Sequence, residues 1–172
     1  MRRLSFLAVV AGLLVLSLAA VAQAQMRPQV GCEPKGCWPV YSYRDVDTDV
    51  AAAQYLLLYH GAQNLTPNNG YFGTQTRAAV QKFQSVEGLK VTGVIDGATW
   101  QKLIKPLRYG ARNQAVRALQ YELANQYGYN LPVTGYYGDQ TRADVKDFQK
   151  KHGLAVTGNT DAATWQAIIS TR

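Results

Sequence analysis

The sequence contains an internal duplication, which constrains its fold more than any other feature. Residues 70–104 align with residues 135–169 at a constant offset of 65, without a gap, and 21 of the 35 aligned positions are identical. One residue upstream must be skipped, after which Val50, Gln54 and Leu57 align with Val116, Gln120 and Leu123. A tandem duplication makes each copy one structural unit. We therefore expect two similar small units rather than one irregular fold.

Each copy predicts three short helices, so the expected fold class is all-α, with two tandem three-helix units. The first helix is expected over residues 48–59, where Val50, Ala53 and Leu57 share one face. The third helix buries Trp100 or, in the second copy, Trp165. The predicted N-caps are Thr74 and Asp139 for the second helices, and Asp96 and Asp161 for the third helices. Gly88 and Gly153 suit the left-handed position that stops the second helices.

The duplication also sets the expected domain boundaries. The first repeat spans residues 47–105 and the second spans residues 111–172, with a linker at 106–110. Pro106 and Gly110 end the preceding helix without imposing one orientation on the two repeats. A unit of about 60 residues buries only a small core and is marginally stable. Docking of the two repeats into one body would increase the stability of each.

Residues 1–24 have the three parts of a secretory signal peptide. Arg2 and Arg3 precede an apolar stretch at 4–21, which ends at the small-x-small site Ala22-Gln23-Ala24. We expect cleavage after Ala24, export to the periplasm, cell wall or exterior, and no stable membrane anchor after processing. The alternative is a transmembrane anchor, since about 18 apolar residues just span a bilayer.

A short segment at 25–46 follows, and it contains both cysteines of the chain. Cys32 and Cys37 enclose four residues, and export would let them pair as a disulfide. A lipid-modified cysteine is disfavoured, because polar residues separate Cys32 from the apolar stretch. The stretch 38–41 either packs on the first repeat or forms a flexible arm.

Composition excludes several classes of function. Two cysteines and two distant histidines, His60 and His152, argue against a dedicated metalloenzyme, although carboxylates could still bind calcium, and no cofactor is expected. The formal net charge of +7 favours anionic partners. Export argues against nucleic acid as that partner. Basic residues near the linker form either a salt-sensitive surface for anionic polymer or a solubilising surface: Lys102, Lys105, Arg108, Arg112 and Arg117.

The repeated motif closely resembles the peptidoglycan-binding domain family, three-helix modules found on bacterial cell-wall enzymes. In the first copy the motif reads Asn69-Gly70-Tyr71-Phe72-Gly73, then Thr76, Ala79-Val80, Phe83-Gln84, Gly88-Leu89 and Thr99-Trp100. The second copy carries the same pattern, and together the two cover residues 48–169. The turn aspartates of the family are replaced here by Asn69, Thr134, Thr92 and Thr157. Because threonine tolerates positive φ poorly, the threonine turns are not expected to keep the same contact.

The resemblance implies peptidoglycan as the partner, which offers glycan rings and the carboxylates of lactyl and stem-peptide groups. A tyrosine ring can lie on a sugar face, and arginine can grip a carboxylate with two parallel hydrogen bonds. Bonding within the fold is favoured over ligand contact for the two glutamines of the motif, and a solvated surface is the alternative for the arginines and tyrosines. The candidate ligand-binding residues are Tyr71, Phe72, Thr74, Arg77, Gln84, Tyr136, Tyr137, Arg142 and Gln149.

The two repeats differ at the start of their second helix. Free N–H groups and the helix dipole attract anions there. Asp139 places a carboxylate at this point in the second repeat, whereas Thr74 in the first is neutral. The first repeat is therefore expected to bind anionic stem peptide better than the second.

The sequence predicts an exported, non-catalytic protein that binds peptidoglycan through two modules. The few glutamates, Glu33, Glu87 and Glu122, have no recognisable catalytic setting. One alternative is an envelope interaction module that positions a secreted wall enzyme, using tyrosines as a protein interface: Tyr41, Tyr43, Tyr109, Tyr127 and Tyr129. A weaker alternative is an unrecognised peptidoglycan hydrolase.

Overall fold

The computed structural model describes residues 37–66 and 69–170, and within these ranges the chain is all-helical. Isolated β-bridges, rather than strands, connect its loops there. The helices are α1 (Thr48–Tyr59), α2 (Thr74–Val86), α3 (Gly97–Leu103), α4 (Gln114–Asn125), α5 (Asp139–Lys151) and α6 (Ala162–Ser170). The expected signal peptide and Cys32 lie outside the described residues, so cleavage and the Cys32–Cys37 disulfide stay predictions.

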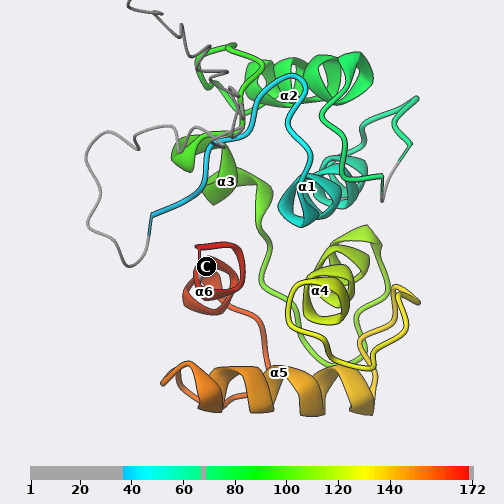
Figure 1. Ribbon diagram of the computed structural model, residues 1–172, viewed down its shortest axis with the longest axis vertical. Coiled ribbons are helices and arrows are strands. Elements are labelled where there is room, and N and C mark those ends of the chain that lie inside the picture. The colour runs from blue at the N-terminus through cyan, green and yellow to red at the C-terminus, as the bar shows by residue number, and fades with distance from the viewer. Residues whose placement is uncertain (1–36, 67–68, 171–172) are drawn as a thin grey trace, which may run out of the picture.

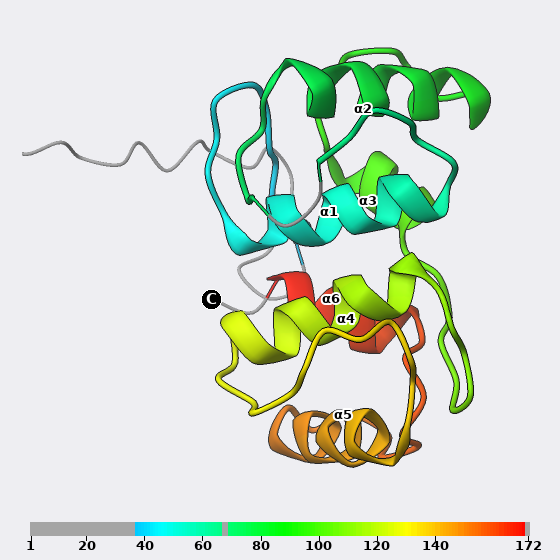
Figure 2. The same cartoon turned by 90° about the vertical axis from the view of Figure 1, so that its right-hand side faces the viewer.

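The two three-helix units stack on each other through their first helices. Figure 2 shows α1 and α4 side by side at the middle of the molecule, with α2 and α5 on opposite outer faces. Figure 1 shows α3 and α6 on one side of this pair. The two units share one continuous hydrophobic core. The linker residues therefore do not leave two independent bodies.

The position of α1 explains why so much of its surface is apolar. Every residue from 49 to 57 is buried, because one side faces its own unit and the other faces α4. Small residues allow the two backbones to approach: Ala52 on α1 and Ala118 on α4 are fully buried. The Tyr55 and Tyr121 rings meet across this interface at 5.9 Å between centroids. A helix that is apolar nearly all round is typical of such a central position.

The segment before α1 packs on the first unit, and the expected linker has the same role in the second unit. The Trp100 indole Nε1 donates to the Pro39 carbonyl at 2.9 Å. Trp38 stacks on Trp100, with ring centroids 6.0 Å apart. In the second unit the Trp165 Nε1 donates to the Lys105 carbonyl at 2.7 Å. Residues 38–41 are thus a packed element rather than a flexible arm.

Backbone pairing confirms that these segments are equivalent. Tyr41 and Ile95 exchange two backbone hydrogen bonds of 3.0 and 2.8 Å, and Leu107 and Thr160 exchange two of 2.9 Å. Leu107 is buried. Residues 106–110, expected as a linker, therefore pack on the second unit through Leu107 and Gly110. The residues of each of the two exchanging pairs are more than fifty positions apart in the sequence, so local sequence patterns do not predict the pairing.

The helix starts are partly as expected. Asp96 and Asp161 cap α3 and α6, accepting from the Thr99 and Thr164 N–H groups at 2.9 and 2.8 Å. The expected N-caps Thr74 and Asp139 are wrong, because both are the first residues of their helices. The N-caps are Gly73 and Gly138, without a side-chain cap. A Cβ on Gly73 would lie 3.2 Å from the Tyr71 ring, and one on Gly138 would lie 3.0 Å from the Tyr136 ring. The overlying tyrosine therefore explains why glycine stands at each N-cap.

Candidate functional site

The turn before α2 keeps its side-chain contact even though its residue types vary. The Asn69 Oδ1 accepts from the Tyr71 N–H at 3.0 Å. In the second unit the Thr134 Oγ1 accepts from the Tyr136 N–H at 3.1 Å. Thr92 and Thr157 do the same for the residues two positions on, at 3.2 and 3.1 Å. The expectation that threonine would lose this contact is wrong, because a hydroxyl oxygen also closes the turn.

Four buried glutamines form hydrogen bonds to the backbone and hydroxyl groups of these turns. The Gln84 Nε2 donates to the Val94 carbonyl at 2.8 Å and to the Thr99 hydroxyl at 3.1 Å, while its Oε1 accepts from the Thr92 and Gly93 N–H groups at 2.9 Å. Gln149 repeats this pattern with Asn159, Thr164, Thr157 and Gly158. Gln54 and Gln120 make the corresponding donor contacts below the turns before α2 and α5.

Four of the candidate ligand-binding residues lie inside the fold. Gln84 and Gln149 are fully buried and bonded internally, as just described. Phe72 and Tyr137 are also fully buried. The Tyr137 hydroxyl donates to the Gly158 carbonyl at 3.1 Å, and burial raises the pKa of this tyrosine to about 12. The assignment of these four to a ligand surface is corrected: they shape the fold.

The remaining candidates of the first unit are exposed around the start of α2. Tyr71, Thr74 and Tyr43 line a cavity of about 390 Å³ beside the turn, together with Gly73 and Thr76. Tyr71 is 42% exposed, so part of its ring is free to meet a ligand. Arg77 is also exposed but lies on the next face of α2, where a Cβ on Gly93 would come within 3.0 Å of its Cγ.

In the second unit the cavity beside this turn is smaller and more highly charged, and it lies at the start of α4 rather than at the start of α5. Tyr136 lines a cavity of about 280 Å³ with Arg112 and Arg117. The Arg112 guanidinium carbon lies 3.8 Å from the centre of the Tyr136 ring, a cation–π contact. The carboxylate of Asp139 lies close enough to Tyr109 to raise the pKa of that hydroxyl. Arg142 is exposed, with its guanidinium carbon 5.8 Å from the Tyr109 ring centre.

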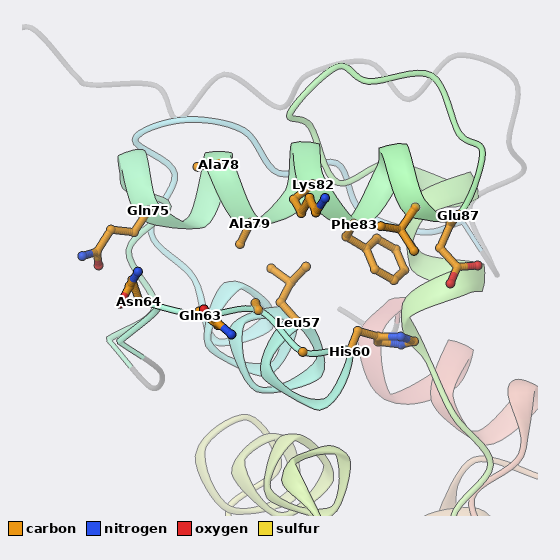
Figure 3. A pocket seen from close by; sticks show the side chains of 13 residues that line it. Leu57, His60, Gln63, Asn64, Gln75, Ala78, Ala79, Lys82, Phe83 and Glu87 are labelled. Atoms are coloured by element: carbon orange, nitrogen blue, oxygen red, sulfur yellow. The ribbon is translucent and has the colours of Figure 1, made fainter.

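A third cavity, which the sequence did not predict, lies between α1 and α2. This α1–α2 groove has a volume of about 600 Å³, and Figure 3 shows its lining from both helices. Leu57, Ala79 and Phe83 form an apolar floor, while Lys82 and Glu87 stand at the rim. Its signal in the sequence is faint, because part of its wall is the loop at 60–64, outside the gapless part of the duplication.

The described residues show neither a metal cluster nor a membrane span. Among residues 37–66 and 69–170, no three His, Cys, Asp or Glu side chains gather so that they could hold a metal ion. In the same part of the chain, no helix is long and apolar enough to cross a bilayer.

Comparison with known proteins places the chain in a family. The model of the family described as "Putative peptidoglycan binding domain" matches residues 46–103 and 112–168. These two matches cover more than half of the chain, and each includes one set of three helices. The protein therefore belongs to the peptidoglycan-binding domain family, and it carries that domain twice.

Three curated relatives match parts of the chain. A protein from Kitasatospora aureofaciens named "Uncharacterized protein in bpoA1 3'region" is 43% identical over 61 residues, covering 35% of this chain and 52% of the relative. The N-acetylmuramoyl-L-alanine amidase CwlM of Mycobacterium tuberculosis is 31% identical over 129 residues, covering 64% and 32%. The zinc D-Ala-D-Ala carboxypeptidase of Streptomyces albus G is 35% identical over 79 residues, covering 44% and 30%. The chain spans about half the length of the first relative and about a third of the two enzymes.

Proposed function

We propose that this protein is an exported, non-catalytic cell-wall protein that holds peptidoglycan through its two repeats. The observation that carries the proposal is the duplicated family domain, with a tyrosine beside a cavity in each copy, exposed in the first and half-buried in the second. Tyr71 and Tyr136 lie against glycan rings, and Arg77 and Arg142 bind carboxylates of the lactyl or stem-peptide groups.

The non-catalytic assignment is supported by the positions of the glutamates. Glu87 faces Lys102 at 3.7 Å, and Glu122 is fully buried. An acid–base pair for glycan hydrolysis needs two carboxyl groups on opposite sides of a substrate cleft. The two hydrolases among the relatives are much longer than the part that this chain matches, so their activities are assigned to them alone.

Two weak sites in one rigid body favour retention on a polymer. When one unit holds a wall fragment, the other meets neighbouring fragments at a high effective concentration. The packing of α1 on α4 fixes the distance between the two sites, and this saves the cost of ordering a linker. Duplication therefore raises avidity without requiring a tight site in either unit.

The two units contribute unequally to this retention. In the second unit, Asp139 already places a carboxylate beside Tyr109, where an anionic ligand group would otherwise sit. In the first unit, the neutral Thr74 leaves the cavity next to Tyr43 and Tyr71 free of such a group. The first unit is therefore the stronger site for anionic stem peptide.

The alternative function, an envelope interaction module, is less well supported, because most of the five tyrosines expected to form its interface are not exposed. Tyr41 is buried and Tyr127 is half-buried, with its hydroxyl bonded to the Ile168 carbonyl. The Tyr129 hydroxyl donates to Asp147 at 2.8 Å. Tyr43 and Tyr109 alone of the five tyrosines are exposed. Wall binding is therefore the better supported function.

Co-sedimentation with purified, protein-free sacculi tests the proposed function. The mature chain should pellet at both low and high salt, and the double variant Arg77→Ala, Arg142→Ala should remain largely in the supernatant. The variant Lys90→Ala, Lys150→Ala removes two exposed cations elsewhere and should pellet like the wild type. Failure of the wild type to pellet at low salt would contradict wall binding. Release of soluble muropeptides would support a hydrolase instead.

A further inference from the structure

The two units differ in the groove between their first and second helices. In the second unit this groove is filled by the protein itself. The Tyr127 ring lies on Phe148, with centroids 4.8 Å apart, and its hydroxyl donates to the Ile168 carbonyl at 2.5 Å. Tyr129 then reaches across the groove from the loop after α4, and its hydroxyl donates to the Asp147 carboxylate on α5 at 2.8 Å.

In the first unit, His60 takes the place of Tyr127. Its ring meets Phe83 in an edge-type contact at the same centroid distance, 4.8 Å. Its Nε2 is 3.0 Å from the carbonyl of Leu103, the residue that aligns with Ile168. Burial lowers the pKa of His60, which favours the neutral ring, and the bond to a carbonyl requires the Nε2–H tautomer. The inner end of the groove is therefore sealed in both units.

The outer part of the groove is open in the first unit alone. The Ala62 N–H donates to the Leu57 carbonyl at 2.9 Å, just as the Tyr129 N–H donates to the Leu123 carbonyl at 3.0 Å. Ala62 is therefore the structural counterpart of Tyr129, and it has no side chain to reach across. Lys82 stands where the second unit has Asp147. Both partners of the bridging hydrogen bond are thus replaced, and the α1–α2 groove of about 600 Å³ stays open.

The walls of this groove are suited to a particular kind of ligand. Leu57, Ala79 and Phe83 offer a floor for methyl groups, and its volume lies in the range of small-ligand sites. Lys82 offers a cation at the rim, and Glu87 offers an anion there that also faces Lys102 at 3.7 Å. A sugar ring would need an exposed aromatic face, but Phe83 is only 6% exposed and is in an edge-type contact with the His60 ring. A zwitterionic peptide with small side chains matches both the floor and the rim charges.

We propose that the α1–α2 groove of the first unit binds the stem peptide of peptidoglycan, with alanyl methyl groups on the floor, a carboxylate at Lys82 and an amine at Glu87. This inference rests on the proposed function, which supplies the wall as partner. It adds a site separate from the tyrosine cavities beside the turns. It also gives the first unit alone a peptide groove, since the second unit has closed its own with Tyr129.

The test is calorimetric titration of the mature chain with a soluble stem peptide that carries alanine, a free carboxylate and a free amine, released from purified peptidoglycan. Ala62→Tyr copies the second unit and should weaken binding at least about tenfold by filling the groove. Ala78→Phe fills it independently from α2, and the matched change in the second unit, Ala143→Phe, should leave binding unchanged. Lys82→Gln should weaken binding about tenfold, whereas Lys90→Gln should not. Thermal unfolding checks that each variant is folded.

The outcomes separate this inference from the proposed function. If the wild type pellets with sacculi but does not bind the stem peptide, or if Ala62→Tyr and Ala78→Phe bind it normally, the groove assignment is overturned and wall binding stands. If the acetylated and amidated peptide binds as tightly as the charged one, the groove accepts an uncharged protein segment instead. If the wild type binds neither sacculi nor peptide, both proposals fail.

Discussion

At the scale of single residues, the buried glutamines carry much of the specificity of the fold. Gln84 satisfies two turn N–H groups, one carbonyl and two hydroxyls from one side chain with no exposed surface. Buried backbone groups without partners cost about 1–3 kcal/mol each. One side chain thus fixes the turn at 92–94 relative to α2 and, through Thr99, to α3.

Gln84→Ala should therefore reduce the free energy of unfolding by about 2–4 kcal/mol, since it leaves several buried groups unsatisfied. Chemical denaturation of the full chain measures this change. Gln101→Ala, at an exposed position of α3, is the matched control and should change stability by less than about 0.5 kcal/mol. Equal stability of the two variants would contradict the role given to Gln84.

A second prediction at this scale concerns the charge at the start of α2. Thr74→Asp should weaken stem-peptide binding to the turn site of the first unit, because a carboxylate beside Tyr43 and Tyr71 repels an anionic ligand. Asp139→Thr should strengthen binding to the second unit. The measurement is the affinity of each variant for an anionic muropeptide at low salt. If neither Thr74→Asp nor Asp139→Thr changes the affinity, the expected difference between the two units is contradicted.

At the scale of elements, the segment before each first helix completes the unit. Trp38 and Tyr41 pack on Trp100, and the Pro39 carbonyl binds its indole. The α3 helix has only seven residues, too few to be stable without such packing. The segment therefore supports α3 in the way that residues 105–107 support α6.

Trp38→Ala should lower the free energy of unfolding by about 3 kcal/mol, since a large buried ring is replaced by a cavity. Val40→Ala, two residues on and exposed, is the control and should have a small effect. Thermal or denaturant unfolding gives both values. A loss below about 1 kcal/mol for Trp38→Ala would show that the segment is peripheral.

The elements also show how far the sequence allowed prediction. The duplication and its apolar spacing predicted the helices well: α1 has the expected bounds, and Asp96 and Asp161 are caps. The caps Thr74 and Asp139 were misassigned, because the N-cap depends on an overlying tyrosine ring, and the packing of residues 106–110 on the second unit depends on distant backbone pairing. The candidates Tyr71 and Tyr136 lie beside cavities, but the α1–α2 groove depends on Ala62, in a loop where the duplication is gapped.

At the scale of the whole molecule, the shared core makes the two units one cooperative body. The α1–α4 interface contains fully buried alanines and the Tyr55–Tyr121 contact, so opening it would expose apolar surface from both units. A unit of about 60 residues is only marginally stable alone. Each unit therefore depends on the other for its stability.

Unfolding should accordingly be a single transition for both units. Trp165→Phe leaves its fluorescence reporters in the first unit, and the double variant Trp38→Phe, Trp100→Phe leaves one in the second unit. Each variant is unfolded while its tryptophan fluorescence and its helical circular dichroism are both recorded. Within each variant the two signals should give the same unfolding midpoint, even if the variants differ in stability. A fluorescence midpoint that departs from the helix signal in either variant would indicate two independent domains.

The most direct test of wall binding through both units is a binding isotherm on purified sacculi for the wild type, Tyr71→Ala, Tyr136→Ala and the double variant. Each single variant should bind more weakly than the wild type. The double variant should lose far more affinity than either, because two linked sites act together. Binding of the double variant at the wild-type level would contradict wall binding through both units.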